Sequence, residues 1–129
     1  MKHHISLRHL VTLLFLSVAI LFLHVAASRF YWYDAIFYFD KIMHFLGGLW
    51  WGYFFLFFRR DQSAKSRFMH TIVAVFVIGI FWELYEYGYQ AYYRTDGIAS
   101  PLDSIDDIFF DTLGGVVAVC SIHLKRFFK

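Results

Sequence analysis

The sequence has little of what stabilises small secreted domains or zinc modules. Its 129 residues include a single cysteine, Cys120, and a single proline, Pro101. One cysteine excludes a disulfide framework within the chain and a zinc site built from several cysteines. Charged residues are also scarce, at 17% of the chain, whereas hydrophobic residues make up 60%. Because a chain of this size cannot hide so much apolar surface from water, we expect neither a soluble domain nor a disordered one.

Four long apolar stretches account for most of the chain. They run from about 7 to 27, 35 to 58, 68 to 93 and 104 to 127. A helix needs about 20 apolar residues to cross the hydrocarbon core of a bilayer. The stretches are too long for membrane strands and lack their sustained alternation. The sequence therefore predicts an all-α protein, an integral membrane four-helix bundle that forms one transmembrane domain over residues 1–129.

The first stretch has two interpretations. Its basic start, its apolar run and the sequence Val25-Ala26-Ala27-Ser28 are compatible with a cleaved signal peptide. We favour a retained membrane helix because the apolar run is longer than a signal peptide needs. Either alternative leaves the other three crossings and their orientation unchanged.

Basic residues gather on one side of the predicted membrane. The other side has only Arg29 and Arg94, while the basic side has nine: Lys2, Arg8, Arg59, Arg60, Lys65, Arg67, Lys125, Arg126 and Lys129. Because lysine and arginine mark the cytoplasmic side, both termini and the 59–67 loop are predicted to be cytoplasmic. Nothing beyond charge suggests that this loop binds nucleic acid.

Acidic residues show the opposite bias. Asp61 is the only acid on the cytoplasmic side, and nine lie in the outer half or outer loops: Asp34, Asp40, Glu83, Glu86, Asp96, Asp103, Asp106, Asp107 and Asp111. At about 1.5 Å per residue, Asp40, Glu86 and Asp107 lie about 5 to 10 Å below the outer ends of three different stretches. Spacings of three or four residues put each set on one helix face, as in Asp40 with His44. The sequence thus predicts that three helices direct their acids into one cavity.

Several carboxylates inside a membrane must be protonated, paired with cations or bound to metal. One imidazole with several carboxylates suits a divalent ion such as Mg, Mn, Fe or Zn. The candidate metal ligands are Asp40, His44, Glu83, Glu86, Asp107 and Asp111. Two alternatives stay open, a proton-sharing carboxyl network without metal and a set of simple interface charges.

Cations and small residues flank these acids. Lys41 and Arg94 are placed at the opening of the cavity, where they can meet an anionic headgroup, offset carboxylates or extend to the interface. The pairs Gly47-Gly48 and Gly114-Gly115 are typical of close helix approach in membranes. His24, which has no acid nearby in sequence, is interpreted as an interface or packing residue, and Asp103 as a cap of the last helix.

Three segments resemble known families of small membrane proteins. Residues 40–45, Asp-Lys-Ile-Met-His-Phe, resemble the D-K-x-x-H-F motif of VanZ-like proteins, and residues 107–114 resemble their later D-x-x-x-N-T-x-G element. Glu83-Leu84-Tyr85-Glu86 is similar to the E-L-x-E of YjdF-like inner-membrane proteins. Asp111 stands where the asparagine is usual, and Glu86 where VanZ-like proteins have glutamine. The resemblance spans residues 40–115 and includes none of the first stretch.

The resemblance implies a bacterial inner-membrane protein with several crossings. VanZ-like proteins are associated with glycopeptide (teicoplanin) resistance and the cell envelope, but the resemblance implies no settled reaction. We therefore expect a site open to the outer leaflet that acts on a lipid or an envelope precursor with an anionic headgroup. Membrane lipids are the expected partners, and a homo-oligomer stays open.

If the protein is an enzyme, the residues favour metal-assisted hydrolysis or transfer. Glu83 or Glu86 would be the general base where it does not bind metal, and Lys41 or Arg94 would hold charge on the leaving side. Two alternatives from other classes remain. One is a proton-linked transporter or lipid-handling protein, and the other is a regulatory or structural membrane protein that catalyses nothing.

Overall fold

The computed structural model describes residues 7–58, 62–93 and 100–127, with side chains up to residue 122. These residues form five helices: α1 (Leu7–Phe30), α2 (Trp32–Ala35), α3 (Phe39–Phe58), α4 (Ala64–Tyr93) and α5 (Pro101–Phe127). No strand occurs among them, and the prediction of an all-helical chain is confirmed for this part of the protein.

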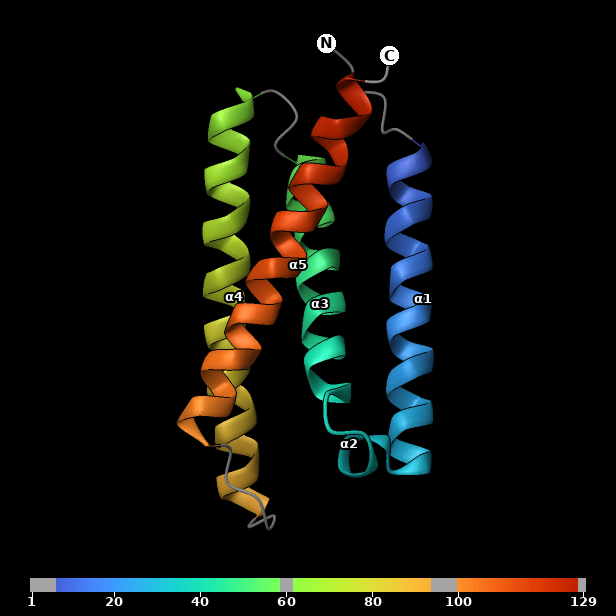
Figure 1. The fold of residues 1–129 in the computed structure, drawn as a ribbon, viewed down its shortest axis with the longest axis vertical. Coiled ribbons are helices and arrows are strands. Elements are labelled where there is room, and N and C mark those ends of the chain that lie inside the picture. Colours follow the sequence, from blue (N-terminus) through green and yellow to red (C-terminus); the bar gives the residue numbers. More distant parts are fainter. Residues whose placement is uncertain (1–6, 59–61, 94–99, 128–129) are drawn as a thin grey trace.

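The four long helices run alternately up and down, and α5 crosses in front of α3 at an angle (Figure 1). Helix α3 packs most extensively against α5, α4 contacts both of them, and α1 packs along α3. The start of α3, the end of α4 and the start of α5 lie at the same end of the molecule, the lower end in Figure 1. The polar segments of three helices therefore share one region of the fold.

Helix α3 begins four residues later than the sequence indicated. Tyr31 adopts a left-handed conformation, with φ of 57°, which ends α1 and starts the single turn of α2. Ile36 is extended, so the chain resumes a helix only at Phe39. Aromatic contacts hold this turn in place, since the rings of Tyr33 and Phe39 lie 5.2 Å apart. The predicted start near residue 35 was therefore wrong. The backbone conformations of Tyr31 and Ile36, which hydropathy does not reveal, interrupt the helical chain before Phe39.

Helices α4 and α5 both begin earlier than hydropathy alone suggested. The Ser66 amide donates a hydrogen bond of 3.3 Å to Oγ of Ser63, which caps α4. The helix therefore begins at Ala64, four residues before the predicted start at about residue 68. Pro101 occupies the first position of α5, where its missing N–H costs no hydrogen bond. Polar capping residues lie outside the apolar stretches, so helix boundaries drawn from hydropathy do not include them.

Glycines allow the backbones of α3 and α5 to touch. A Cβ atom on Gly48 would lie 1.8 Å from the carbonyl oxygen of Asp111, and one on Gly114 would lie 2.2 Å from that of Phe45. No side chain fits at either position without moving a helix. The close approach predicted from the glycine pairs is found at this contact.

Within the described residues, two helices, α1 and α4, are long and apolar enough to cross a membrane. Helix α1 has few buried residues, which include Leu16 and Ala27, so most of its apolar surface faces outward. Such an outward apolar surface is expected where lipid, rather than water, surrounds a helix.

We predict that Gly48→Ala and Gly114→Ala each destabilise the protein by at least about 1 to 3 kcal/mol, because the added methyl group collides with backbone. Gly88→Ala is the matched control, since a Cβ there meets nothing within 4 Å. Alanine at position 88 should stabilise α4 slightly through its helix propensity. Thermal unfolding in detergent measures all three variants, and equal unfolding temperatures would contradict the helix contact.

Candidate metal centre between α3, α4 and α5

His44 lies at the centre of the acidic cluster. The residue is buried, with 6% of its surface exposed. Its Nε2 atom lies 3.8 Å from Oε1 of Glu83, 3.9 Å from Oδ2 of Asp40 and 3.9 Å from Oδ1 of Asp107. Three helices thus supply carboxylates around one ring nitrogen, and these carboxylates come from three of the acidic segments singled out in the sequence.

The other ring nitrogen of His44 is held by Asp111. Nδ1 donates a hydrogen bond of 3.2 Å to Oδ2 of Asp111, which is also buried. Glycine makes room for this carboxylate, because a Cβ on Gly79 would lie 2.9 Å from Oδ2 and one on Gly47 would lie 3.8 Å from Oδ1. Asp111 thus orients the imidazole ring through Nδ1 and leaves Nε2 facing the other carboxylates.

Lys41 lies inside the cluster rather than at its opening. Its ammonium group donates to Asp103 and, at 2.6 Å, to Oδ1 of Asp107. The lysine is buried with 8% of its surface exposed, which is typical of a paired charge. Offsetting carboxylates was one of the three roles left open for Lys41, but Asp103 was not predicted as its partner, because it was interpreted as a helix cap. The two ion pairs connect the start of α3 with the first turns of α5.

Glu83 has the one oxygen of the described cluster that is buried without a partner. Its Oε1 makes no hydrogen bond within the part of the chain that the structure describes, although the Ser104 hydroxyl contacts its carboxyl group. Oxygen and nitrogen atoms of His44, Glu83 and Glu86 lie within 4.8 Å of one another, as do those of Asp40, His44 and Asp107. Glu86 is only half-buried and lies nearer than Glu83 to the C-terminal end of α4.

These separations fit two ligands on one ion. Two ligand atoms that are each about 2.1 Å from a metal can lie up to about 4.2 Å apart. The distances of 3.8 and 3.9 Å from His44 Nε2 are within this limit. The unpartnered Glu83 oxygen provides an acceptor that a cation would satisfy.

The charges of the cluster do not balance by themselves. Six carboxyl groups lie around Lys41 and His44: Glu83, Asp107 and Asp111 are buried, Asp40 and Glu86 are half-buried, and Asp103 is exposed. Buried carboxylates in excess of their cations must gain protons or a further cation. The cluster can therefore hold a divalent ion or store protons.

Helices α1 and α2 contribute a pair that the sequence analysis missed. Nδ1 of His24 and the hydroxyl of Tyr33 are 2.9 Å apart, so His24 has a specific partner. Burial, together with the carboxylates of Asp40 and Glu86, raises the pKa of Tyr33. Tyr33 thus lies at the edge of the cluster. Arg94, the other predicted cation, lies outside the described residues.

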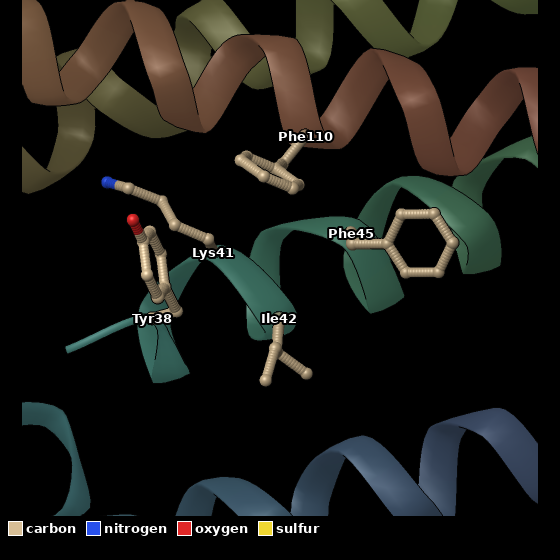
Figure 2. Close-up of a pocket in the computed structure, with 5 residues that line it drawn as sticks. All are labelled: Tyr38, Lys41, Ile42, Phe45 and Phe110. Atoms are coloured by element: carbon tan, nitrogen blue, oxygen red, sulfur yellow. The ribbon is translucent and has the colours of Figure 1, made fainter. Parts of the chain in front are cut away.

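An apolar groove adjoins the cluster on the α3–α5 face. It has a volume of about 270 Å³ and is lined by Tyr38, Lys41, Ile42, Phe45 and Phe110. Figure 2 shows the alkyl stem of Lys41 between Tyr38 and Phe110, with its nitrogen at one end of the groove. Because that nitrogen pairs with Asp103 and Asp107, the groove begins where the acidic cluster ends.

Residues 1–126 match the model of a family described as "Predicted membrane protein (DUF2238)". The chain belongs to this family. A Thermotoga maritima protein described as uncharacterized is 32% identical to this DUF2238 protein over 125 residues, which cover 89% of this chain and 63% of the relative. The chain thus spans less than two thirds of that protein's length. No solved structure matches the chain.

We predict that Lys41→Met destabilises the DUF2238 protein by about 3 to 5 kcal/mol, because the buried Asp107 loses its cation. The double variant Lys41→Met/Asp107→Asn should regain part of this loss, since it leaves no unpaired charge at that position. A double-mutant cycle of unfolding free energies in detergent measures the coupling. Strictly additive effects of the two substitutions would contradict the buried pair.

Proposed function

We propose that this DUF2238 protein binds a divalent metal ion through His44 Nε2 and acts with it on a membrane lipid or envelope precursor. The observation that carries the proposal is the buried, unpartnered Oε1 of Glu83, 3.8 Å from that nitrogen. A carboxylate oxygen in such a position needs a proton or a cation. The imidazole nitrogen opposite it makes a metal ion the better explanation.

The geometry divides the predicted ligands into two groups. His44 shares one triad of ligand atoms with Glu83 and Glu86 and a second with Asp40 and Asp107. These residues are the proposed direct ligands, with Glu86 as a ligand or base. Asp111 instead orients the ring through Nδ1, as carboxylates commonly do behind a metal-binding histidine. One nitrogen among several oxygens suits Mn, Fe or Zn, and Mg is compatible with the oxygens.

We further propose that all four long helices cross the membrane, with both termini in the cytoplasm. The uneven distribution of lysine and arginine along the sequence supports this orientation. The cluster then lies in the outer half of a bacterial inner membrane and opens toward the outer leaflet. Such a position suits a substrate that is anchored in that leaflet.

A bound metal would polarise a phosphate or acyl group and activate a water molecule. Glu86, half-buried at the outer side, is the proposed general base. Lys41 is a positioning residue in this scheme, since its ammonium group holds Asp103 and Asp107 rather than a leaving group. Arg94 stays the candidate for the charge on the leaving side.

The groove supports a lipid as the substrate class. Its walls are aromatic and aliphatic, and its polar end adjoins the cluster (Figure 2). Its volume of about 270 Å³ lies near the lower limit for small-molecule pockets, which suits one segment of a hydrocarbon chain rather than a whole lipid. A headgroup at the metal and a chain in the groove would place one amphiphile across both.

The proposed relationship to VanZ-like and YjdF-like proteins has structural support. Asp40, Lys41 and His44 of the D-K-x-x-H-F motif lie in the cluster together with Glu83 and Asp107. Residues that are far apart in the sequence thus form one centre, as a shared function would require. An envelope role follows from this relationship as a proposal.

A proton-linked transporter is the alternative that the excess of carboxyl groups favours. Six acids around two bases can exchange protons without any metal. A regulatory or structural role would need only the helix contacts.

We predict that the purified protein retains about one divalent ion per chain and that His44→Ala and Glu83→Gln lose it, because each substitution removes a direct ligand. His70→Ala and Asp106→Asn are matched controls, since His70 and Asp106 are exposed and lie outside the cluster. Elemental analysis of detergent-purified protein gives the metal content.

Absence of metal from a folded wild-type protein would contradict the proposal. Proton flux in liposomes that Glu86→Gln abolishes would then identify the transporter, and unchanged folding without flux would identify a structural role.

We predict that Phe110→Trp reduces the amount of co-purified phospholipid, because the larger ring fills the groove. Phe109→Trp is the control, since Phe109 is exposed and does not line the groove. Native mass spectrometry measures the lipid that each variant retains after detergent release. Equal lipid retention in the two variants would contradict lipid binding in the groove. It would leave the proposed metal binding untouched.

A further inference from the structure

A second polar site lies at the opposite end of α4. Arg67, in the first turns of that helix, is buried with only 8% of its surface exposed. Its Nε atom has no hydrogen-bond partner within the described residues, and no carboxylate there lies within ion-pair distance of its guanidinium group. A buried N–H without an acceptor carries a free-energy cost. Among the described residues, Nε of Arg67 is therefore a buried donor without an acceptor.

Thr71 lies one turn further along the same face. It is completely buried, and its Oγ1 has no partner in the described part of the chain. Threonine in a helix commonly donates to the carbonyl four residues earlier, as Thr12 donates to Arg8 and Thr112 to Ile108. Thr71 does not make this bond to Arg67. Its hydroxyl is therefore available to a ligand on the buried face of α4.

The surroundings of these two residues are apolar. Ile72, next to Thr71, packs against the core cluster of Leu56, Ala118 and Val119. Val75, one turn beyond Thr71, packs against α5, where a Cβ on Gly115 would lie 3.1 Å from its methyl group. Apolar side chains thus lie beside Thr71, where a charge-assisted hydrogen bond is stronger than in water.

We infer that Arg67 and Thr71 form a binding site for a phosphate group. The planar guanidinium group can donate two hydrogen bonds to phosphate oxygens, and the Thr71 hydroxyl can donate another. The start of a helix, which Ser63 caps in α4, adds a favourable partial charge.

This phosphate site is independent of the proposed metal centre. Arg67 precedes Glu83 by 16 residues, which corresponds to about 24 Å along a helix. It therefore lies near the opposite face of the bilayer, at the depth of lipid headgroups. The phosphate could belong to an inner-leaflet lipid or be free in solution, and the chemistry of the site is the same for both.

The test measures the unfolding temperature of the full chain in a maltoside detergent that contains no phosphate. Phosphatidylglycerol is titrated in one arm and inorganic phosphate in the other. We expect a ligand-dependent rise for the wild type. Arg67→Gln should weaken the apparent affinity about tenfold or more, because it removes a charge-assisted interaction. Lys65→Gln is the matched control, since it removes the same charge from an exposed residue two positions away.

Thr71→Val and Arg67→Lys complete the test. Thr71→Val keeps the shape of the side chain but loses the donor, so we expect weaker binding with normal folding. Arg67→Lys should retain part of the affinity. A rise with phosphatidylglycerol alone assigns the site to a lipid headgroup, and a rise with inorganic phosphate assigns it to soluble phosphate.

Three results would overturn the inference: no rise for the wild type with either ligand, an equal loss in Lys65→Gln and Arg67→Gln, or unchanged affinity in Thr71→Val. If Arg67→Gln does not fold, the Thr71→Val and Arg67→Lys titrations decide alone. The metal content of the same samples is measured separately, so failure at one end of α4 is distinguishable from failure at the other.

Discussion

The hydrogen bond from His44 to Asp111 is the interaction on which the proposed centre depends. It fixes the imidazole ring between α3 and α5 and directs Nε2 at the carboxylates of Asp40, Glu83 and Asp107. This bond forms only because glycine faces Asp111, with Gly48 against its backbone and Gly79 against its side chain. Close backbone packing, which usually serves helix association in membranes, here makes room for a buried acid.

Charge then links the helices around that bond. Lys41 of α3 pairs with Asp103 and Asp107 of α5, so part of the negative charge is neutralised within the protein. Other carboxylates, on Asp40, Glu83 and Asp111, face the imidazole of His44. Because buried carboxylates without cations are unfavourable in an apolar medium, we propose that this point receives a cation or protons. At the far end of α4, the buried Arg67 presents the opposite need.

Much of this arrangement follows from the sequence, and the physical reasons for the exceptions are specific. Hydropathy gave four helical segments, and residue spacing put Asp40, Glu86 and Asp107 at similar depths, where the structure brings all three close to His44. Hydropathy cannot reveal the left-handed Tyr31 that separates α1 from α2. Spacing along one helix cannot show that Lys41 reaches Asp103, because their contact depends on how α3 and α5 cross. The roles of Gly79 and Thr71 cannot be predicted from the sequence, because they depend on which residues of other helices lie opposite them.

The most direct measurement is an anomalous-difference map from crystals of the full chain grown with Mn²⁺. The account predicts a peak about 2.0 to 2.3 Å from Nε2 of His44, with oxygens of one carboxylate pair, either Glu83 and Glu86 or Asp40 and Asp107, completing the coordination. A map with these side chains in the same positions and no peak among them would contradict the metal centre.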